Sequence, residues 1–401
     1  MRRFRIHRIG IVALCLLLLH GMAPAAQAQD ASPATTSPCA PPSTVMDLRV
    51  WLETLHCEIG AAWTAAVHAD RQAPSLEQLI GQKLVVRMSG RQPSASLLRR
   101  IRHGRIGGVV LLTSNIRTRT GLVELTRRLQ RAAADGGQPP LLIAVDQEGG
   151  SVKRVTWAPP TLTVPQMGRI GSTSIARLQG ARTGAALRAL GINVNLAPVA
   201  DVPRSRASFM VQQGRTFSFD AARTARLADA FATGLASSGV MATMKHFPGI
   251  GLAIRNTDHY VETIEAPRSV LAPDLLPYRR AIDHDIPLIM LSNVTYSAFD
   301  DGNAAGWSHA IAVTLLRDDL DFAGVTITDS LDGTAHARGL RVSDLAIRAA
   351  AAGTDLILTT GSEKTTRRLY ETLLARAREG ALPLDRLRDS YRRIVALKDR
   401  L

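Results

Sequence analysis

The chain has 401 residues, of which 46% are hydrophobic, so it can bury one large core or two smaller ones. Its formal net charge of +15 favours anionic partners such as wall polymers, membrane surfaces or nucleic acid. The cationic residues are scattered, however, and aromatic residues make up only 4% of the chain, which argues against nucleic-acid binding. The sequence contains neither an HExxH nor a CxxC motif, and we expect no metal and no organic cofactor.

Residues 1–28 have the pattern of a secretory signal peptide. An apolar run over residues 9–19 is followed by the small-residue sequence Ala26-Gln27-Ala28, and it is too short for the ~20 residues that span a bilayer. Four arginines precede the run, namely Arg2, Arg3, Arg5 and Arg8. We expect cleavage near Ala28, export to the periplasm or the medium, and no membrane span in the mature chain. Loss of the four arginines lowers the formal net charge from +15 to +11.

Residues 29–74 are expected to connect the signal peptide to the fold. Residues 30–44 are rich in Pro, Ser, Thr and Ala and have the composition of a flexible linker. A helical segment is predicted over residues 45–68. Cys39 and Cys57 remain after signal removal, and an oxidising compartment would let them form a disulfide if their geometry fits.

From Ser75 onward, short apolar runs alternate with longer amphipathic ones. The runs predict strands at residues 83–88, 108–112, 141–145, 193–197, 241–245, 288–291, 325–328 and 355–358. Most of these runs are continuously apolar, as expected of strands covered on both faces. The amphipathic stretches predict helices at residues 94–102, 120–134, 174–190, 220–238, 275–283, 342–352 and 365–379.

Regular alternation of strand and helix favours an α/β fold, a TIM-like (β/α)8 barrel over residues 75–401. The structural alternative is a doubly wound open sheet. That fold would need a reversal of strand order, and no Gly-x-Gly-x-x-Gly follows the first predicted strand. A single catalytic domain is therefore expected, because no residues remain for a second large one.

Polar residues follow nearly every predicted strand, as a barrel with one functional rim requires. One such residue alone is as well explained as a helix cap. The set is harder to explain that way: it comprises Asp146-Gln147-Glu148, Asp201, Arg215-Thr216-Phe217-Ser218, Lys245-His246, Ser292-Asn293 and Thr328-Asp329-Ser330.

Five segments, in order along the chain, resemble glycoside hydrolase family 3 in its single-domain β-N-acetylhexosaminidase branch. They are residues 143–152 (IAVDQEGGSV), 191–201 (GINVNLAPVAD), 214–218 (GRTFS), 245–251 (KHFPGIG) and 322–331 (FAGVTITDSL). Weaker matches occur at residues 80–84, 107–115 and 352–355. The resemblance implies a barrel without the second α/β domain found in larger members of the family.

The resemblance places Asp329 at the nucleophile position of the family. A carboxylate there would attack the anomeric carbon and form a covalent glycosyl intermediate. Thr328 and Ser330 stand beside it and would stabilise the ionised form by hydrogen bonding.

The resemblance also implies four substrate-binding residues. Asp146 matches a carboxylate that accepts hydrogen bonds from hydroxyls at the far edge of the sugar. Arg215, Lys245 and His246 match donors around the ring. The alternative for Asp146 is an acidic residue at the start of a helix.

The chain departs from the family pattern after the KHFPG motif, where family members carry an Asp-x-His dyad as general acid and base. Counted without gaps, the dyad positions hold Asn256 and Asp258, Thr257 lies between them, and His259 falls one place late. Three alternatives remain. Asp258 could be the acid and base, if its pKa is raised. His259 could enter after a one-residue shift. The protein could also bind sugar without efficient hydrolysis.

These features together predict an exported retaining β-N-acetylglucosaminidase acting on cell-wall or related glycans, including muropeptide-like amino-sugar oligosaccharides. We expect a monomer that binds no nucleic acid. A β-glucosidase or β-xylosidase of the same family is one alternative, because the sequence does not locate the contacts to a 2-acetamido group. A non-catalytic periplasmic protein that binds sugar or cell wall is the other.

Overall fold

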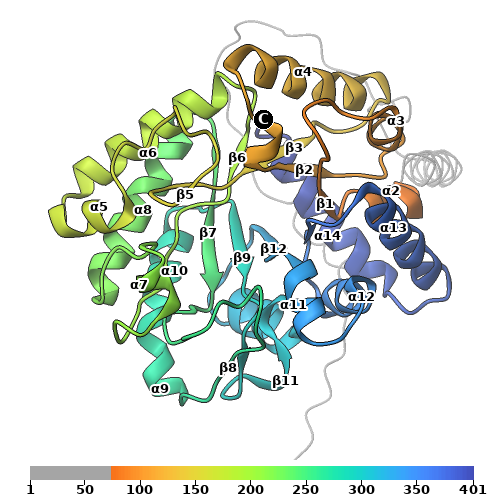
Figure 1. Cartoon of the computed structure of the whole chain (residues 1–401). Helices are drawn as coiled ribbons and strands as arrows, with labels where there is room; N and C mark the ends of the chain where they lie inside the picture. The colour runs from red at the N-terminus through yellow and green to blue at the C-terminus, as the bar shows by residue number, and fades with distance from the viewer. Residues whose placement is uncertain (1–73) are drawn as a thin grey trace, which may run out of the picture. The chain divides into compact units, whose positions relative to one another are not determined.

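The computed structural model describes residues 74–401, shown in colour in Figure 1. The predicted signal peptide, linker, helical segment and cysteine pair lie outside the described residues and stay predictions. Within residues 74–401, no helix is long and apolar enough to cross a membrane.

Eight parallel strands form the central sheet of the described chain. They are β1 (Leu84–Arg87), β2 (Gly108–Leu111), β3 (Leu142–Val145), β6 (Val194–Asn195), β7 (Met241–Phe247), β9 (Leu288–Leu291), β12 (Val325–Thr328) and β13 (Ile357–Thr359). Their order is β12-β9-β7-β6-β3-β2-β1-β13. A parallel bridge between Ile327 and Leu356 joins β12 to the chain entering β13, with Leu356 N donating to Thr326 O at 2.8 Å. The sheet therefore closes, and the barrel prediction is confirmed over the open sheet.

The apolar character of the strands is explained by two separate cores. On β9, Leu288 and Met290 belong to a cluster inside the barrel, while Ile289 and Leu291 pack with the surrounding helices. The same alternation holds on β12, where Val325 and Ile327 point inward. Each strand is thus buried on both faces.

Helices cover the outside of the barrel (Figure 1). Seven overlap the predicted ones: α3 (Ala95–Arg102), α4 (Arg119–Asp135), α6 (Thr173–Arg188), α8 (Ala221–Ser237), α10 (Leu276–Asp283), α12 (Val342–Ala352) and α13 (Glu363–Arg378). Five of them follow a residue whose side chain accepts a first-turn backbone N–H, which fixes their starts. These capping residues are Ser94, Thr118, Ser172, Asp220 and Ser362.

Other helical elements were not predicted from the sequence. They are α2 (Leu76–Gly81), η1 (Thr113–Asn115), α5 (Val164–Ile170), α7 (Phe209–Gln212), α9 (Arg268–Leu271), η2 (Ala272–Leu275), η3 (Ala305–Trp307), the π-helix η4 (Ala310–Asp318), α11 (Leu331–Ala337) and α14 (Leu384–Lys398). Most are short or lie in loops, where helical periodicity has little length over which to repeat.

Helix α14 covers the N-terminal end of the barrel. Its Ile394 and Leu397 join the interior cluster. Lys398 Nζ donates to Gly107 O at 2.8 Å and to Gln82 Oε1 at 2.6 Å, beside the starts of β2 and β1. The opposite, C-terminal end of the barrel is left for the functional site.

Two small sheets are built from loops that follow the barrel strands. β4 (Gln147–Gly149) and β5 (Val152–Lys153) form an antiparallel pair after β3. β8 (Thr263–Ile264), β10 (Thr295–Tyr296) and β11 (Asp300–Ala304) form a three-stranded sheet from the loops after β7 and β9. Because β4 follows Asp146 directly, this residue does not begin a helix, and the helix-start alternative is wrong.

Candidate active site

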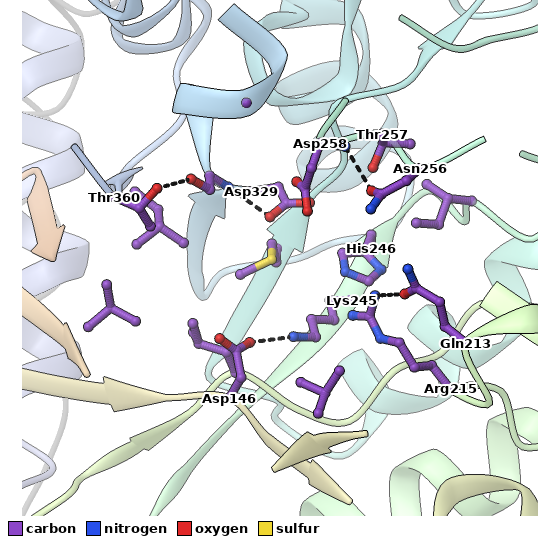
Figure 2. A pocket seen from close by; sticks show the side chains of 18 of the residues that line it. Asp146, Gln213, Arg215, Lys245, His246, Asn256, Thr257, Asp258, Asp329 and Thr360 are labelled. Carbon is purple, nitrogen blue, oxygen red and sulfur yellow. Dashed lines mark hydrogen bonds and ion pairs between the residues drawn. The ribbon is translucent and has the colours of Figure 1, made fainter. Parts of the chain in front are cut away.

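A pocket of about 420 Å³ lies at the C-terminal ends of the barrel strands. All seven candidate site residues from the sequence line it. Figure 2 shows the pocket with Asp329 and Asp258 on one side and Asp146, Lys245 and Arg215 on the other. The seven residues are Asp146, Arg215, Lys245, His246, Asp258, His259 and Asp329. The barrel brings them together from strand ends and loops that are far apart in the sequence.

Asp146 and Lys245 form an ion pair at the base of the pocket. Lys245 Nζ lies 2.8 Å from Asp146 Oδ1 and 2.7 Å from Glu148 Oε1. Glu148 in turn receives two hydrogen bonds from Arg215, at 2.9 and 2.8 Å. The result is a buried cluster in which two carboxylates hold two cations in fixed positions. Glu148 was not assigned a role from the sequence.

The charges in this cluster set its pKa values. Burial alone would raise the pKa of Glu148, but the charges of Arg215 and Lys245 outweigh it and hold that pKa well below its ordinary value. Burial opposes the charge on Lys245, yet Asp146 and Glu148 raise its pKa above the ordinary value. Lys245 and Arg215 therefore remain cationic donors at neutral pH.

His246 is oriented by a second buried carboxylate, that of Asp201. The His246 Nδ1 atom lies 2.8 Å from Asp201 Oδ2, while Asp201 Oδ1 accepts from the backbone N–H of Ile250 at 2.8 Å. Since Asp201 accepts the Nδ1 proton, the Nε2 atom of His246 is available to the pocket. The sequence placed Asp201 after a predicted strand, but it did not identify His246 as the hydrogen-bond partner of Asp201.

Asp329 follows β12 directly, and Asp329 Oδ1 accepts the backbone N–H of Ser330 at 2.7 Å. The predicted hydrogen bond from Ser330 is thus made by its backbone, whereas the side chains of Thr328 and Ser330 have other partners. Thr328 Oγ1 accepts from the backbone N–H of Leu358 at 3.0 Å, and Ser330 Oγ lies 3.0 Å from Thr360 Oγ1. Both hydroxyls tie β12 to the chain at β13, and the hydrogen bond to the Asp329 carboxylate comes from the backbone N–H of Ser330.

Asp258 stands on the loop after β7. Asn256 Oδ1 accepts the backbone N–H of Asp258 at 3.0 Å, so Asn256 forms a side-chain turn in the place of the family's dyad Asp. Surrounding protein atoms partly remove water from the Asp258 carboxyl, and this desolvation raises its pKa. The nearby charge of Asp329 raises the pKa further. Figure 2 shows the Asp258 side chain turned toward Asp329.

Sequence reasoning did not single out Arg154 and Gln213, which also line the pocket and contact residues of the ion cluster. Arg154, just after β5, lies 3.8 Å from Asp146 Oδ2. Gln213 Oε1 accepts from Arg215 at 3.1 Å. Both are on loops between the recognised motifs, so no strand end marked them.

The rest of the lining is part polar or small and part apolar. The polar or small residues are Asn256, Thr257, Ser330, Gly333 and Thr360. The apolar side chains come from the strand ends and the loops beyond them, and they are Val110, Leu112, Val152, Leu196, Phe209, Ile250, Met290 and Leu358. A pocket with charged hydrogen-bonding groups on its walls and apolar side chains between them suits a sugar ring, which presents hydroxyls at its edge and C–H groups on its faces. Within residues 74–401, no group of three or more His, Cys, Asp or Glu side chains is arranged to hold a metal ion.

Comparison with known proteins identifies the family. The model of the glycosyl hydrolase family 3 N-terminal domain matches residues 75–397. The chain belongs to this family. It is therefore a glycoside hydrolase acting on O-glycosyl bonds, and the family expectation from the five motifs is confirmed.

Three similar proteins cover most of the chain. A protein of Arthroderma benhamiae named as an uncharacterized secreted glycosyl hydrolase is 32% identical over 346 residues, 85% of this chain and 98% of the relative. The structure of a glycoside hydrolase family 3 β-N-acetylglucosaminidase from Paenibacillus sp. has a TM-score of 0.78 at 31% identity, covering 82% of this chain and 63% of that one. The β-N-acetylhexosaminidase structure from Beutenbergia cavernae has a TM-score of 0.75 at 29% identity, covering 82% of this chain and 99% of that one.

Proposed function

We propose that the chain is an exported retaining β-N-acetylhexosaminidase that removes terminal β-linked N-acetylglucosamine from cell-wall or related glycans. The observation that carries the reaction type is the placement of Asp329 and Asp258 at one pocket, close enough for the charge of Asp329 to raise the pKa of Asp258. An ionised carboxylate beside a protonated carboxyl is the pair that a retaining glycosidase needs.

The buried ion cluster is suited to hold the sugar. Asp146 has oxygens that can accept from adjacent hydroxyls, and Lys245 and Arg215 supply donors that Glu148 fixes in place. His246 adds its Nε2 atom. Because these groups are already oriented in the structure, little rotamer freedom is lost when the sugar binds, and binding energy serves to place the anomeric carbon over Asp329.

In the first step, a carboxylate oxygen of Asp329 attacks the anomeric carbon. The bond from that carbon to the leaving oxygen breaks, and Asp258 gives its proton to this oxygen. The products are the released alcohol, an ester between Asp329 and the sugar, and an ionised Asp258.

In the second step, water replaces Asp329 at the anomeric carbon. The Asp258 carboxylate takes a proton from the water as the oxygen attacks, and the ester bond breaks to return ionised Asp329 and protonated Asp258. Esterification removes the negative charge of Asp329, so the pKa of Asp258 falls when a base is needed and rises again when an acid is needed.

Two observations support the substrate and the location. The Paenibacillus and Beutenbergia structures, which resemble this barrel, are named for activity on β-linked N-acetylhexosamines. Residues 1–28 have the signal-peptide pattern, and the Arthroderma relative is named as secreted. An exported amino-sugar hydrolase with a mature charge of +11 is suited to anionic wall polymers.

The reaction is tested with aryl β-N-acetylglucosaminide and aryl β-glucoside as substrates. We expect the wild type to prefer the first, and the β anomer to appear first in proton NMR. Asp329→Asn should lower kcat/KM by more than about 10³-fold, because the nucleophile is lost. Asp258→Ala treated with dinitrophenyl β-N-acetylglucosaminide should accumulate a glycosyl ester on the peptide that contains Asp329, measured by mass spectrometry.

Each part of the proposal has its own contradicting result. Unchanged turnover by Asp329→Asn would remove the nucleophile assignment. An α product would remove retention, and preference for the glucoside would remove the substrate assignment. Export is checked by N-terminal sequencing of the mature protein, and a chain that still begins at Met1 would contradict it.

A further inference from the structure

The loop that carries Asp258 is closed by hydrogen bonds between its own residues and is tied to β10 at its end. We call residues 254–262 the acid/base loop. At its start, the backbone N–H groups of His259 and Tyr260 both donate to Asn256 O at 3.0 Å. At its end, Glu262 Oε1 accepts from Arg255 at 2.6 Å, and Glu262 O accepts from Thr295 N at 3.1 Å. The loop is therefore a formed turn, and the contact at its centre decides how far Asp258 reaches into the pocket.

That central contact is made with Gly333, in the first turn of α11. A Cβ atom added at Gly333 would lie 2.3 Å from the backbone oxygen of Asp258 and 3.2 Å from its Cα. Contacts under 3.0 Å are essentially never made by real Cβ atoms. The loop backbone thus rests directly on the helix backbone, at a distance that a side chain at this position would prevent.

Helix α11 is itself fixed to the rim of the barrel. Asp332 Oδ2 accepts from Thr359 Oγ1 at 2.9 Å and from the backbone N–H of Thr360 at 2.6 Å. Asn293 Nδ2 donates to Ser330 O at 3.0 Å. Since α11 begins two residues after Asp329, the surface on which the loop rests moves with the nucleophile.

We propose that Gly333 is a positioning residue, which sets the reach of the Asp258 carboxyl toward Asp329 by letting the acid/base loop rest on the backbone of α11. The inference depends on the proposed role of Asp258 as acid and base. Its physical basis is steric. Helix α11 begins two residues after Asp329 and also supports the loop that carries Asp258, so one short helix positions both carboxyls. Because residue 333 has no side chain, the loop backbone can occupy the space that a side chain would fill.

A methyl group at this position would displace the acid. To change the 2.3 Å approach into an ordinary contact above 3.4 Å, the loop must withdraw by roughly 1 Å, a displacement that can cost about 10²-fold in rate. The change does not weaken α11, because alanine favours helix more than glycine does. Loss of activity would then come from the position of the acid.

The test compares Gly333→Ala with wild type on phenyl and dinitrophenyl β-N-acetylglucosaminides. A phenyl leaving group needs a proton, whereas a dinitrophenyl group leaves without one. We expect kcat/KM to fall about 10- to 100-fold on the phenyl substrate and to stay within about threefold on the dinitrophenyl substrate. The matched control is Gly302→Ala, where the added Cβ meets its nearest atom at 3.7 Å, and both rates should equal those of the wild type.

A second variant separates position from general damage. Asp258→Glu adds one methylene group, so it should lower the phenyl rate about 10-fold in the wild type and raise it in the Gly333→Ala background. Equal losses on both substrates, or effects of the two changes that simply multiply, would overturn the role of Gly333. Failure of the proposed function looks different: the wild type itself would not cleave the phenyl substrate, or Asp258→Ala would show no dependence on the leaving group.

Discussion

Lys245 Nζ lies 2.7 Å from Glu148 Oε1, and both side chains are almost completely buried. Glu148→Gln keeps the shape of this side chain and removes its charge, which leaves Lys245 and Arg215 with less compensation. Breaking a buried pair on one side costs about 3–5 kcal/mol, so the free energy of unfolding measured in urea should fall by that amount. KM should rise because the two donors lose their fixed positions. Glu124→Gln, which breaks the exposed pair with Arg127, should change stability by less than about 1 kcal/mol.

The same pair predicts a pH dependence of stability. The pKa of Glu148 is lower in the folded protein than its ordinary value of 4.5. The unfolded chain therefore binds the proton more readily, and the stabilisation is present above about pH 4.5 and is lost as the pH falls further. The difference in unfolding free energy between wild type and Glu148→Gln should shrink in acid. A difference that stays constant down to pH 2 would contradict this.

The pH profile of kcat/KM should identify the acid. Glycosylation needs protonated Asp258, so the rate should fall as the pH rises through the raised pKa of this residue. Asp258→Ala should remove this alkaline limb on a phenyl substrate. His259→Gln should keep the limb and move it slightly to higher pH, because the charge of His259 lowers the pKa of Asp258. If the limb disappears in His259→Gln instead, His259 is the acid.

Lys398 lies at the N-terminal end of the barrel, opposite the pocket, and should make the free energy of unfolding increase with pH. Burial lowers its pKa to about 7 in the folded protein, from 10.5. Between these values the unfolded chain binds a proton that the folded chain does not, so stability rises with pH by at most about 1.4 kcal/mol per unit. A neutral amine still has two N–H groups for Gly107 O and Gln82 Oε1.

Lys398→Met is the variant that tests this dependence. Urea unfolding at pH 7, 8 and 9 should show the wild type gaining stability relative to the variant at each step. The exposed Lys364→Met serves as control and should show no such trend. Parallel behaviour of wild type and Lys398→Met would mean that Lys398 is charged in the folded state throughout.

Loss of the apolar packing between α14 and the N-terminal end of the barrel should destabilise the protein without changing catalysis. Ile394 is fully buried in the interior cluster, so Ile394→Ala should lower the free energy of unfolding by about 2–5 kcal/mol. Arg388→Ala, exposed on the same helix, should stay within about 0.5 kcal/mol of wild type. At temperatures where Ile394→Ala is folded, kcat should equal that of the wild type, because the pocket lies at the opposite end.

The alternation of strands and helices could be predicted because its signals are local. The apolar run at residues 288–291 is strand β9, and the amphipathic run at residues 342–352 is helix α12. Helix α14 was not predicted, although its residues 386–393 are amphipathic. Its periodicity also could not show that its apolar side covers the end of a barrel, because that contact is made with distant strands. Short elements such as α11 have too few residues for a periodic pattern.

The sequence by itself determined the fold class, the family and the seven candidate residues at strand ends and in the loops beyond them. Only the tertiary structure decided how these residues interact. Lys245 and Asp146 are 99 positions apart in the chain. Glu148 and Asp201 became visible as partners only because β3, β6 and β7 lie next to one another in the barrel. The altered loop shows the same division. Counting along the chain placed Asp258 where the family has its His. The approach of its backbone to Gly333, and of its carboxyl to Asp329, depends instead on packing of this loop against the start of α11, which is distant in sequence.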